Sequence, residues 1–405
     1  MSLSINKIAC GHQYSLVLLS DGSLWGAGKN IFEPMGVTSN TIKHWTKLID
    51  GDVQDIAAGD THSVVLKTDG SLLFSGFSGN WWLGDEFENT HYQWNPVSSR
   101  AVKQIVCGHS HALVLLENGA VMGFGFNSCG QLGDGSATMQ MQWTTVIPTS
   151  VTRIAAGSMH SLAIKDDGSL WVTGANSASQ LGFVGPNVNC WTKTDQYDVT
   201  DIAAGLSHSI ILKQDDSIWG VGQNKNGELG DETISDKTKW SPVFCGPVKS
   251  IASYGYRSFM IQKDDSLWVT GDNYSGQLGL GNVCDSYRWT RAFYGKIKQM
   301  DLSCFHSMVV SEDGSLWKTG RNKHSELGFL GDCIHTWSVD SFFENMILQS
   351  WLDEMTDEGV TSVGKEKPNK MEGIVGHSGI TGVAGKKDGE GGTDEEDEEL
   401  IHAMF

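Results

Sequence analysis

Five histidines recur at equivalent positions of the chain, and imidazole nitrogens are common metal ligands and general bases. They are His62, His111, His160, His208 and His306, with Tyr14 and Arg257 at the two remaining equivalent positions. A ring of imidazoles around one axis would form a metal site. However, a histidine that repeats at one position of a repeated unit is typical of a buried side chain that hydrogen-bonds a neighbouring backbone group. We therefore predict a structural role for this set and no metal site.

Glycine-rich segments such as GFGFNSCG resemble nucleotide-binding loops in composition. Their spacing is GxGxxxxG, and a strand-rich segment follows in place of the helix whose N-terminus would hold a phosphate. The GKK triplet at residues 385–387 lacks the earlier glycine and the following Ser or Thr of a phosphate loop, and HExxH, GxSxG and EF-hand motifs are absent. The sequence therefore predicts no catalytic residues and no cofactor, and we expect a protein that is not an enzyme.

The histidines belong to seven copies of one unit, such as IAAGSMHSLAIKDDGSLWVTGAN. The copies begin at Ile8, Ile56, Ile105, Ile154, Ile202, Ile251 and Met300, in steps of 48 or 49 residues. A tryptophan keeps the same step at Trp45, Trp94, Trp143, Trp191, Trp240, Trp289 and Trp337. An aromatic residue repeated in this way predicts packing between neighbouring units.

Each unit reads as about four short strands. Two β-rich runs flank a turn signal, as at Asp21-Gly22 or Asp167-Gly168, which predicts a hairpin with a two-residue primed turn. Two units carry Asp215-Asp216 and Asp264-Asp265 instead, and we expect strain or another turn type there, because Asp tolerates a positive φ less well than Gly. A unit of this kind cannot bury both faces alone, so the sequence predicts an all-β fold, a seven-bladed β-propeller.

We assign residues 1–350 to the propeller and residues 351–405 to a tail. Residues near 335–350 are expected to pair with, or pack beside, the first 25, because an open ring would expose apolar faces and strand edges. The tail is rich in Gly and contains the acidic run DEEDEE at residues 394–399. This composition predicts disorder.

The consensus IAAGxxHSLALxxDGSLWxxGxNxxGQLG, nearly complete in residues 105–133 and 154–182, resembles the repeat of the regulator of chromosome condensation family. The resemblance covers roughly residues 5–350 and implies the same propeller. The family includes exchange factors for a small GTPase, ubiquitin-ligase subunits and a plant ultraviolet-B photoreceptor, so the fold does not select a function.

Two functions of the family find little support in the residues. The exchange-factor interpretation implies a wedge inserted from an extended segment, whereas the unit length here varies by only one residue and the basic arm of the founding member is missing. The photoreceptor interpretation implies tryptophans clustered in the GxxHS segment, where this chain has only Tyr256 of similar kind.

Breaks in the repeat are candidate binding sites, because aromatic and Arg residues are enriched at binding hot spots. Blade two has Trp81 and Trp82 in place of repeat residues, and blade six has Tyr256 and Arg257. Local repacking between blades is the alternative explanation. The tail ends in an apolar cluster that could dock into a partner's groove: Leu400, Ile401, Met404 and Phe405.

The formal net charge of -19 argues against binding to nucleic-acid phosphates. The sequence shows no signal peptide and no apolar run long enough to span a bilayer, and its eight cysteines form no CxxC pair, so we predict a cytoplasmic protein that binds neither nucleic acid nor membrane. The leading hypothesis is a non-catalytic scaffold that recruits a protein partner. A guanine-nucleotide exchange factor and a structural component of a larger assembly, such as a virus particle, remain alternatives.

Overall fold

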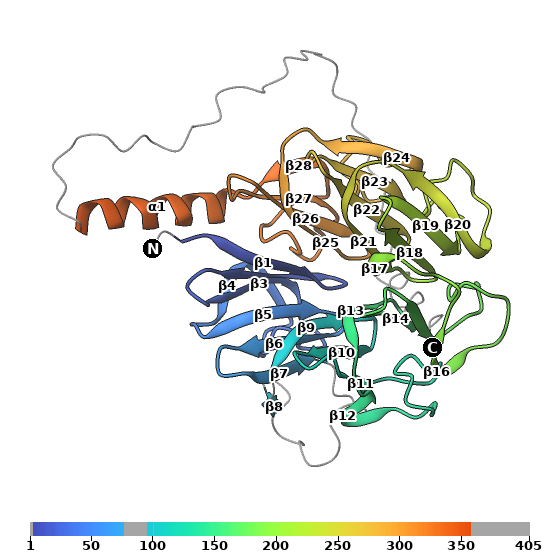
Figure 1. Cartoon of the computed structure of the whole chain (residues 1–405). Helices are drawn as coiled ribbons and strands as arrows, with labels where there is room; N and C mark the ends of the chain where they lie inside the picture. The colour runs from blue at the N-terminus through green and yellow to red at the C-terminus, as the bar shows by residue number, and fades with distance from the viewer. Residues whose placement is uncertain (1–2, 77–94, 100, 358–405) are drawn as a thin grey trace, which may run out of the picture. The chain divides into compact units, whose positions relative to one another are not determined.

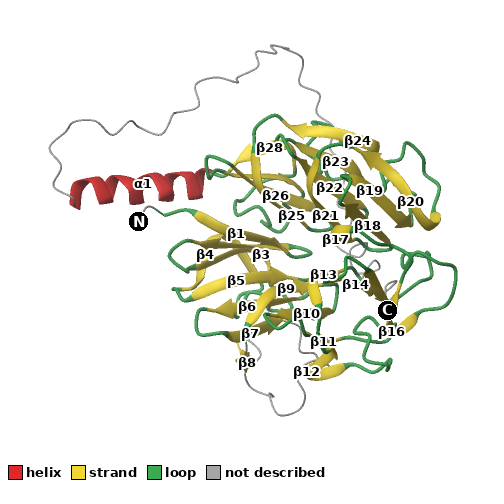
Figure 2. Cartoon of the chain, viewed as in Figure 1, coloured by secondary structure: helices red, strands yellow, loops and turns green. Residues whose placement is uncertain are grey.

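The chain forms seven four-stranded antiparallel sheets arranged as the blades of a β-propeller (Figure 1). The structure, a computed structural model, describes residues 3–76, 95–99 and 101–357. Each sheet takes its four strands consecutively from the sequence, and one helix, α1 (Ser341–Asp357), follows the last blade (Figure 2). The predicted seven-bladed, all-β architecture is confirmed.

The strands of the first four blades are β1 (Ile5–Cys10), β2 (Tyr14–Leu19), β3 (Leu24–Lys29), β4 (Thr41–Ile49), β5 (Val53–Ala58), β6 (His62–Lys67), β7 (Ser71–Gly76), β8 (Asn95–Ser99), β9 (Val102–Cys107), β10 (His111–Leu116), β11 (Val121–Gly125), β12 (Gln140–Ile147), β13 (Val151–Ala156), β14 (His160–Lys165), β15 (Leu170–Gly174) and β16 (Val188–Lys193). Those of the last three are β17 (Val199–Ala204), β18 (His208–Lys213), β19 (Ser217–Gly222), β20 (Lys237–Cys245), β21 (Val248–Tyr254), β22 (Arg257–Gln262), β23 (Leu267–Gly271), β24 (Ser286–Phe293), β25 (Ile297–Leu302), β26 (His306–Ser311), β27 (Leu316–Gly320) and β28 (Ile334–Val339).

The hydrophobic core lies between the blades. It consists of seven apolar clusters, each made of side chains from two neighbouring blades. The first strands of adjacent blades contact one another around the centre, and β25 of the last blade contacts β1 of the first. The ring is therefore closed, and each blade depends on its two neighbours for the burial of its apolar faces.

The repeated hairpins form, but their turn differs from the predicted one. In the first blade the N–H of Gly22 donates to the Leu19 carbonyl at 3.0 Å, and Gly22 has a φ of 79° while Asp21 keeps a negative φ. This is a three-residue loop that ends in a left-handed residue, not a two-residue primed turn. Asp216 and Asp265 take the same left-handed conformation, with φ values of 65° and 63°, so these two turns carry the expected strain without changing type.

The once-per-blade tryptophans pack between blades, as predicted. A Cβ atom added at Gly182 would lie 2.1 Å from Nε1 of Trp240 in the next blade, and one added at Gly328 of the last blade would lie 2.1 Å from Nε1 of Trp45 in the first. Each such glycine therefore leaves room for an indole that crosses the interface between two blades.

The segment after β28 closes the ring by packing, not by strand pairing. Asp340 caps α1, because its Oδ1 accepts the N–H groups of Phe342 at 3.0 Å and Phe343 at 3.1 Å. Phe343 is fully buried in the cluster between the last and first blades, with its ring centroid 5.1 Å from that of Trp45. The predicted packing of residues 335–350 beside the first 25 is confirmed. The helix was not predicted, because the sequence indicated only that this segment would pair with, or pack beside, the first 25 residues. No helix within the described residues has the length and apolar character needed to cross a bilayer.

Candidate functional site

The loops that follow the first strands lie on the same face of the ring as the described loops that follow the third strands, because successive strands are antiparallel. We call this the axial face, and the opposite one, which carries the repeated hairpin turns, the hairpin face. Hydrogen bonds tie these loops to neighbouring blades, as where Ser15 Oγ, near the start of β2, donates to the Glu326 carbonyl at 2.7 Å.

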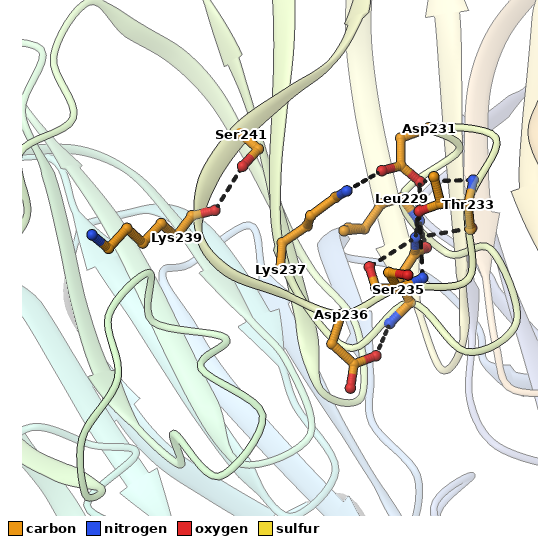
Figure 3. A network of polar contacts seen from close by, with 9 residues as sticks. Leu229, Asp231, Thr233, Ser235, Asp236, Lys237, Lys239 and Ser241 are labelled. Atoms are coloured by element: carbon orange, nitrogen blue, oxygen red, sulfur yellow. Dashed lines mark hydrogen bonds and ion pairs between the residues drawn. The ribbon is translucent and has the colours of Figure 1, made fainter.

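The loops after the third strands are rigidly built. In blade five, Asn224 Nδ2 donates to Asp231 Oδ1 at 2.9 Å, and Asn224 Oδ1 accepts the Leu229 N–H at 2.9 Å. Lys237 forms an ion pair with Asp231 at 2.6 Å (Figure 3). The same hydrogen bond, from a backbone N–H to the Oδ1 of the asparagine five residues before it, recurs at Asn30, Asn127, Asn176, Asn273 and Asn322. The buried amides fix these loops in place, so residues on them are presented in one arrangement.

These rigid loops expose apolar side chains. In five blades one aliphatic residue per loop is 46% to 75% exposed, and we call this set the apolar crown: Ile31, Val184, Ile234, Val283 and Leu330. A single exposed aliphatic residue needs no explanation. A set distributed over the loops of one face is typical of a surface that contacts another protein.

Five side chains from five blades meet where the first strands end around the axis. We call them the axial cluster: His12, Asp60, His109, Tyr254 and Cys304. His109 Nδ1 and the Tyr254 hydroxyl each bond to one oxygen of the Asp60 carboxylate. His12 Nδ1 lies 3.7 Å from Asp60 Oδ2, and Cys304 Sγ completes a group of three possible ligand atoms within 4.8 Å of one another.

Burial and mutual charge set the protonation of the axial cluster. Burial lowers the pKa of His12 to about 4. Burial also raises the pKa of Asp60, but His109, His12 and the Tyr254 hydroxyl outweigh it and lower the value to about 2. For His109 burial lowers the pKa, and the Asp60 carboxylate more than offsets this and raises it. Burial raises the pKa of the Cys304 thiol. The axial cluster therefore holds the ionised carboxylate of Asp60 beside the neutral imidazole of His12.

The ring of repeated histidines is structural, in agreement with the prediction. All five imidazoles are fully buried. Nε2 of His111, His160, His208 and His306 lies 2.7 to 3.0 Å from a serine hydroxyl of the next blade. The expected backbone partners occur as well, because His62, His160 and His208 each also bond to a backbone group of the next blade. Since Ser161 Oγ itself donates to the Gln131 carbonyl at 2.8 Å, the His111 imidazole is the donor to that serine.

Inside the first strands lies a cavity of about 290 Å³. Polar side chains project toward it, including Arg153 and Asp201, which form an ion pair at 2.7 Å between blades four and five. Asp301 also lines it, and its Oδ2 accepts the Cys10 N–H at 2.6 Å across the closing interface. Burial raises the pKa of Asp301 to about 7. This polar lining differs from the mostly apolar walls of small-molecule pockets.

Of the predicted partner-binding residues, two are described by the structure. Tyr256 is half-buried in the loop after β21, two residues after Tyr254 of the axial cluster. Arg257 is fully buried, and its guanidinium forms no hydrogen bond to the residues that the structure describes. Trp81 and Trp82, and the tail residues Leu400, Ile401, Met404 and Phe405, lie outside the described residues, so their role stays a prediction.

Sequence reasoning missed the apolar crown and the axial cluster. One signal was available: Tyr254 stands where every earlier blade has glycine, and Cys304 follows a second departure, Ser303, in the next blade. The convergence of His12, Asp60 and Cys304 had no signal, because these residues are far apart in sequence and meet only in the closed ring.

Comparisons with known proteins agree with this architecture. The family model described as the regulator of chromosome condensation (RCC1) repeat matches residues 5–32, 102–131, 151–180 and 199–228. A comparison with curated proteins found no match. Among solved structures, Prp20p from Saccharomyces cerevisiae is 17% identical over 88% of this chain and 97% of its own, with a TM-score of 0.73. Human WBSCR16 is 20% identical over 76% and 86%, with a TM-score of 0.68. The chain is therefore a seven-bladed β-propeller in which four segments match the repeat of the regulator of chromosome condensation.

Proposed function

We propose that the protein is a non-catalytic, cytoplasmic scaffold that binds a protein partner on the axial face. The observation that carries this proposal is the apolar crown. Its exposed aliphatic side chains stand on loops that buried amides hold in one arrangement. A pre-ordered surface loses little conformational entropy when a partner binds, and burial of its aliphatic groups supplies affinity.

Two further observations support a protein as the partner. The net charge of -19 disfavours nucleic acid and favours a partner with a basic rim, because complementary charge speeds encounter. The structure of Prp20p was described together with its binding to Gsp1p and histones, and yeast Prp20 has been crystallised bound to Kap60. A chain with this fold therefore binds proteins elsewhere.

The test compares two faces of the same ring. Val283→Glu together with Leu330→Glu places charge on the crown in neighbouring blades, while Tyr294→Glu places it on an exposed aromatic residue of the hairpin face, which is 80% exposed. Affinity purification from the native source, read by mass spectrometry, should lose its partner with the crown variant and keep it with the Tyr294 variant. A partner that both variants retain would contradict the axial-face proposal.

Guanine-nucleotide exchange is a second candidate. It is favoured by the propeller fold shared with Prp20p, since the match covers 97% of that protein's chain. Its test is the release of a fluorescent guanine nucleotide from a panel of small GTPases. Acceleration by the wild-type protein would replace the non-catalytic proposal. An unchanged release rate across the panel would support the scaffold.

A further inference from the structure

We propose that three residues of the axial cluster, His12, Asp60 and Cys304, form a site for a divalent transition metal of the zinc class. One imidazole nitrogen, one carboxylate oxygen and one thiol sulfur lie within 4.8 Å of one another. This donor set of nitrogen, oxygen and sulfur suits Zn²⁺ and disfavours Mg²⁺ and Ca²⁺, which select oxygen ligands. The proposal is independent of the partner-binding function.

The geometry needs only a small adjustment. Ligands about 2.0 to 2.3 Å from a tetrahedral metal lie about 3.3 to 3.8 Å from one another. His12 Nδ1 and Asp60 Oδ2, 3.7 Å apart, already fit this range. The sulfur is the third vertex, and since no pair in the group exceeds 4.8 Å, a side-chain shift of about 1 Å brings it within range.

His12 is prepared for a ligand. Its Nδ1 is buried and forms no hydrogen bond within the described part of the chain, and a buried polar atom of this kind is costly unless something binds it. The ring packs edge-on against Phe305 at a centroid distance of 4.9 Å, which fixes its plane. A metal ion in front of Nδ1 would satisfy this nitrogen.

A second layer of hydrogen bonds supports the carboxylate ligand. His109 and the Tyr254 hydroxyl hold the Asp60 carboxylate from outside the group of three, as outer partners commonly hold the ligands of metal sites. On binding, the thiol proton passes to solvent and the sulfur bonds to the metal, so the site supplies two negative charges and one neutral nitrogen.

The three ligands come from the first, second and last blades, which meet where the ring closes. A metal bound here would join these blades across the closing interface. Three protein ligands leave a fourth position open for water or for a group of a partner on the axial face.

The test uses the full-length protein freed of metal with a chelator and titrated with Co²⁺, which replaces Zn²⁺ and shows a charge-transfer absorption band when a thiolate binds it. We expect one such site per chain, displacement of the band by Zn²⁺ and a higher melting temperature with Zn²⁺. Cys304→Ser should abolish the band, and His12→Gln should weaken binding at least tenfold. The matched control is Cys129→Ser, on a loop of the same face, which should keep both the band and the affinity.

Absence of the band, or its persistence in Cys304→Ser, would overturn the proposal. Circular dichroism checks that each variant is folded. Should Cys304→Ser fail to fold, the comparison of His12→Gln with the wild type decides, since unchanged Co²⁺ affinity there would equally refute the site.

Discussion

Replacing Arg257 with histidine should stabilise the propeller. Arg257 occupies the position at which five blades carry a histidine, and it is fully buried without a hydrogen bond to the described residues. Burial lowers its pKa, which shows that the environment disfavours its charge, although Asp272 nearby partly offsets this. An ionised group without a hydrogen-bonded partner is among the costliest features of a protein interior.

The structure already contains the partner that the new histidine needs. Ser307 of the next blade donates its hydroxyl to the Gln277 carbonyl at 2.8 Å, as Ser161 does to Gln131 at 2.8 Å, and Ser161 accepts a bond from His111 at 2.9 Å. Histidine at 257 should make the same bond to Ser307. One such bond contributes about 1 kcal/mol, and removal of the poorly compensated charge adds about 1 to 2 kcal/mol. We expect a gain of about 2 to 3 kcal/mol.

Urea unfolding followed by tryptophan fluorescence measures this gain as a higher transition midpoint at constant slope. Arg257→Met is the matched control, because it removes the charge without supplying the hydrogen bond, and it should gain about 1 kcal/mol less than Arg257→His. The reasoning is refuted if Arg257→His is no more stable than the wild type, or if Arg257→Met matches it. A stabilised Arg257→His that also loses its partner would show that the arginine serves binding at a cost in stability.

Three further predictions concern packing, turns and pH. Gly182→Ala should destabilise the ring by about 2 to 5 kcal/mol in denaturant unfolding, because its φ is +94° and the added methyl would meet Trp240 at 2.1 Å; a loss below 1 kcal/mol would contradict the packing described. Asp216→Gly should raise the free energy of unfolding by up to about 1 kcal/mol, because glycine adopts the left-handed φ of this turn without strain. Loss of the exposed ion pair with Lys263 offsets part of this gain, and a lower urea midpoint for the variant would contradict the reasoning. Stability should fall as the pH drops from about 6.5 toward 4, because burial lowers the pKa of His160 to about 4, so the unfolded state binds the proton first. His160→Gln should reduce the slope of stability against pH by the equivalent of about one bound proton. An unchanged slope would indicate that this imidazole is charged in the folded protein.

Repetition made the fold predictable. Markers that return every 48 or 49 residues define seven units, and the unit's strand pattern defines a blade, so strands, ring and inter-blade tryptophans all followed from the residues. The turn geometry did not follow, because Asp-Gly suits both a two-residue primed turn and a three-residue loop that ends in a left-handed glycine. Only the strand register decides between them, and Leu19 pairs with Ser23 across three residues.

The helix and the site were harder to predict for different reasons. The segment that forms α1 has apolar residues that suit an outer strand as well, and its N-cap, Asp340, identifies a helix only when Phe343 and Ile347 are recognised as one face. The residues of the axial cluster are close in space but far apart in sequence. His12 and Cys304 are separated by most of the propeller in sequence and become neighbours only when the last blade meets the first.

Because every blade is made of four consecutive strands, none has to wait for a distant part of the chain to complete its sheet. During synthesis each blade can assemble as it leaves the ribosome and dock on the one before it, since domains and repeats generally fold as units from the N-terminus. The apolar side of the first blade stays uncovered until the last blade and Phe343 of α1 arrive to bury it. A chain that stops before α1 would leave this apolar side exposed, and chaperones and proteases can recognise such a surface. Docking of α1 therefore removes a signal that marks the chain as incomplete.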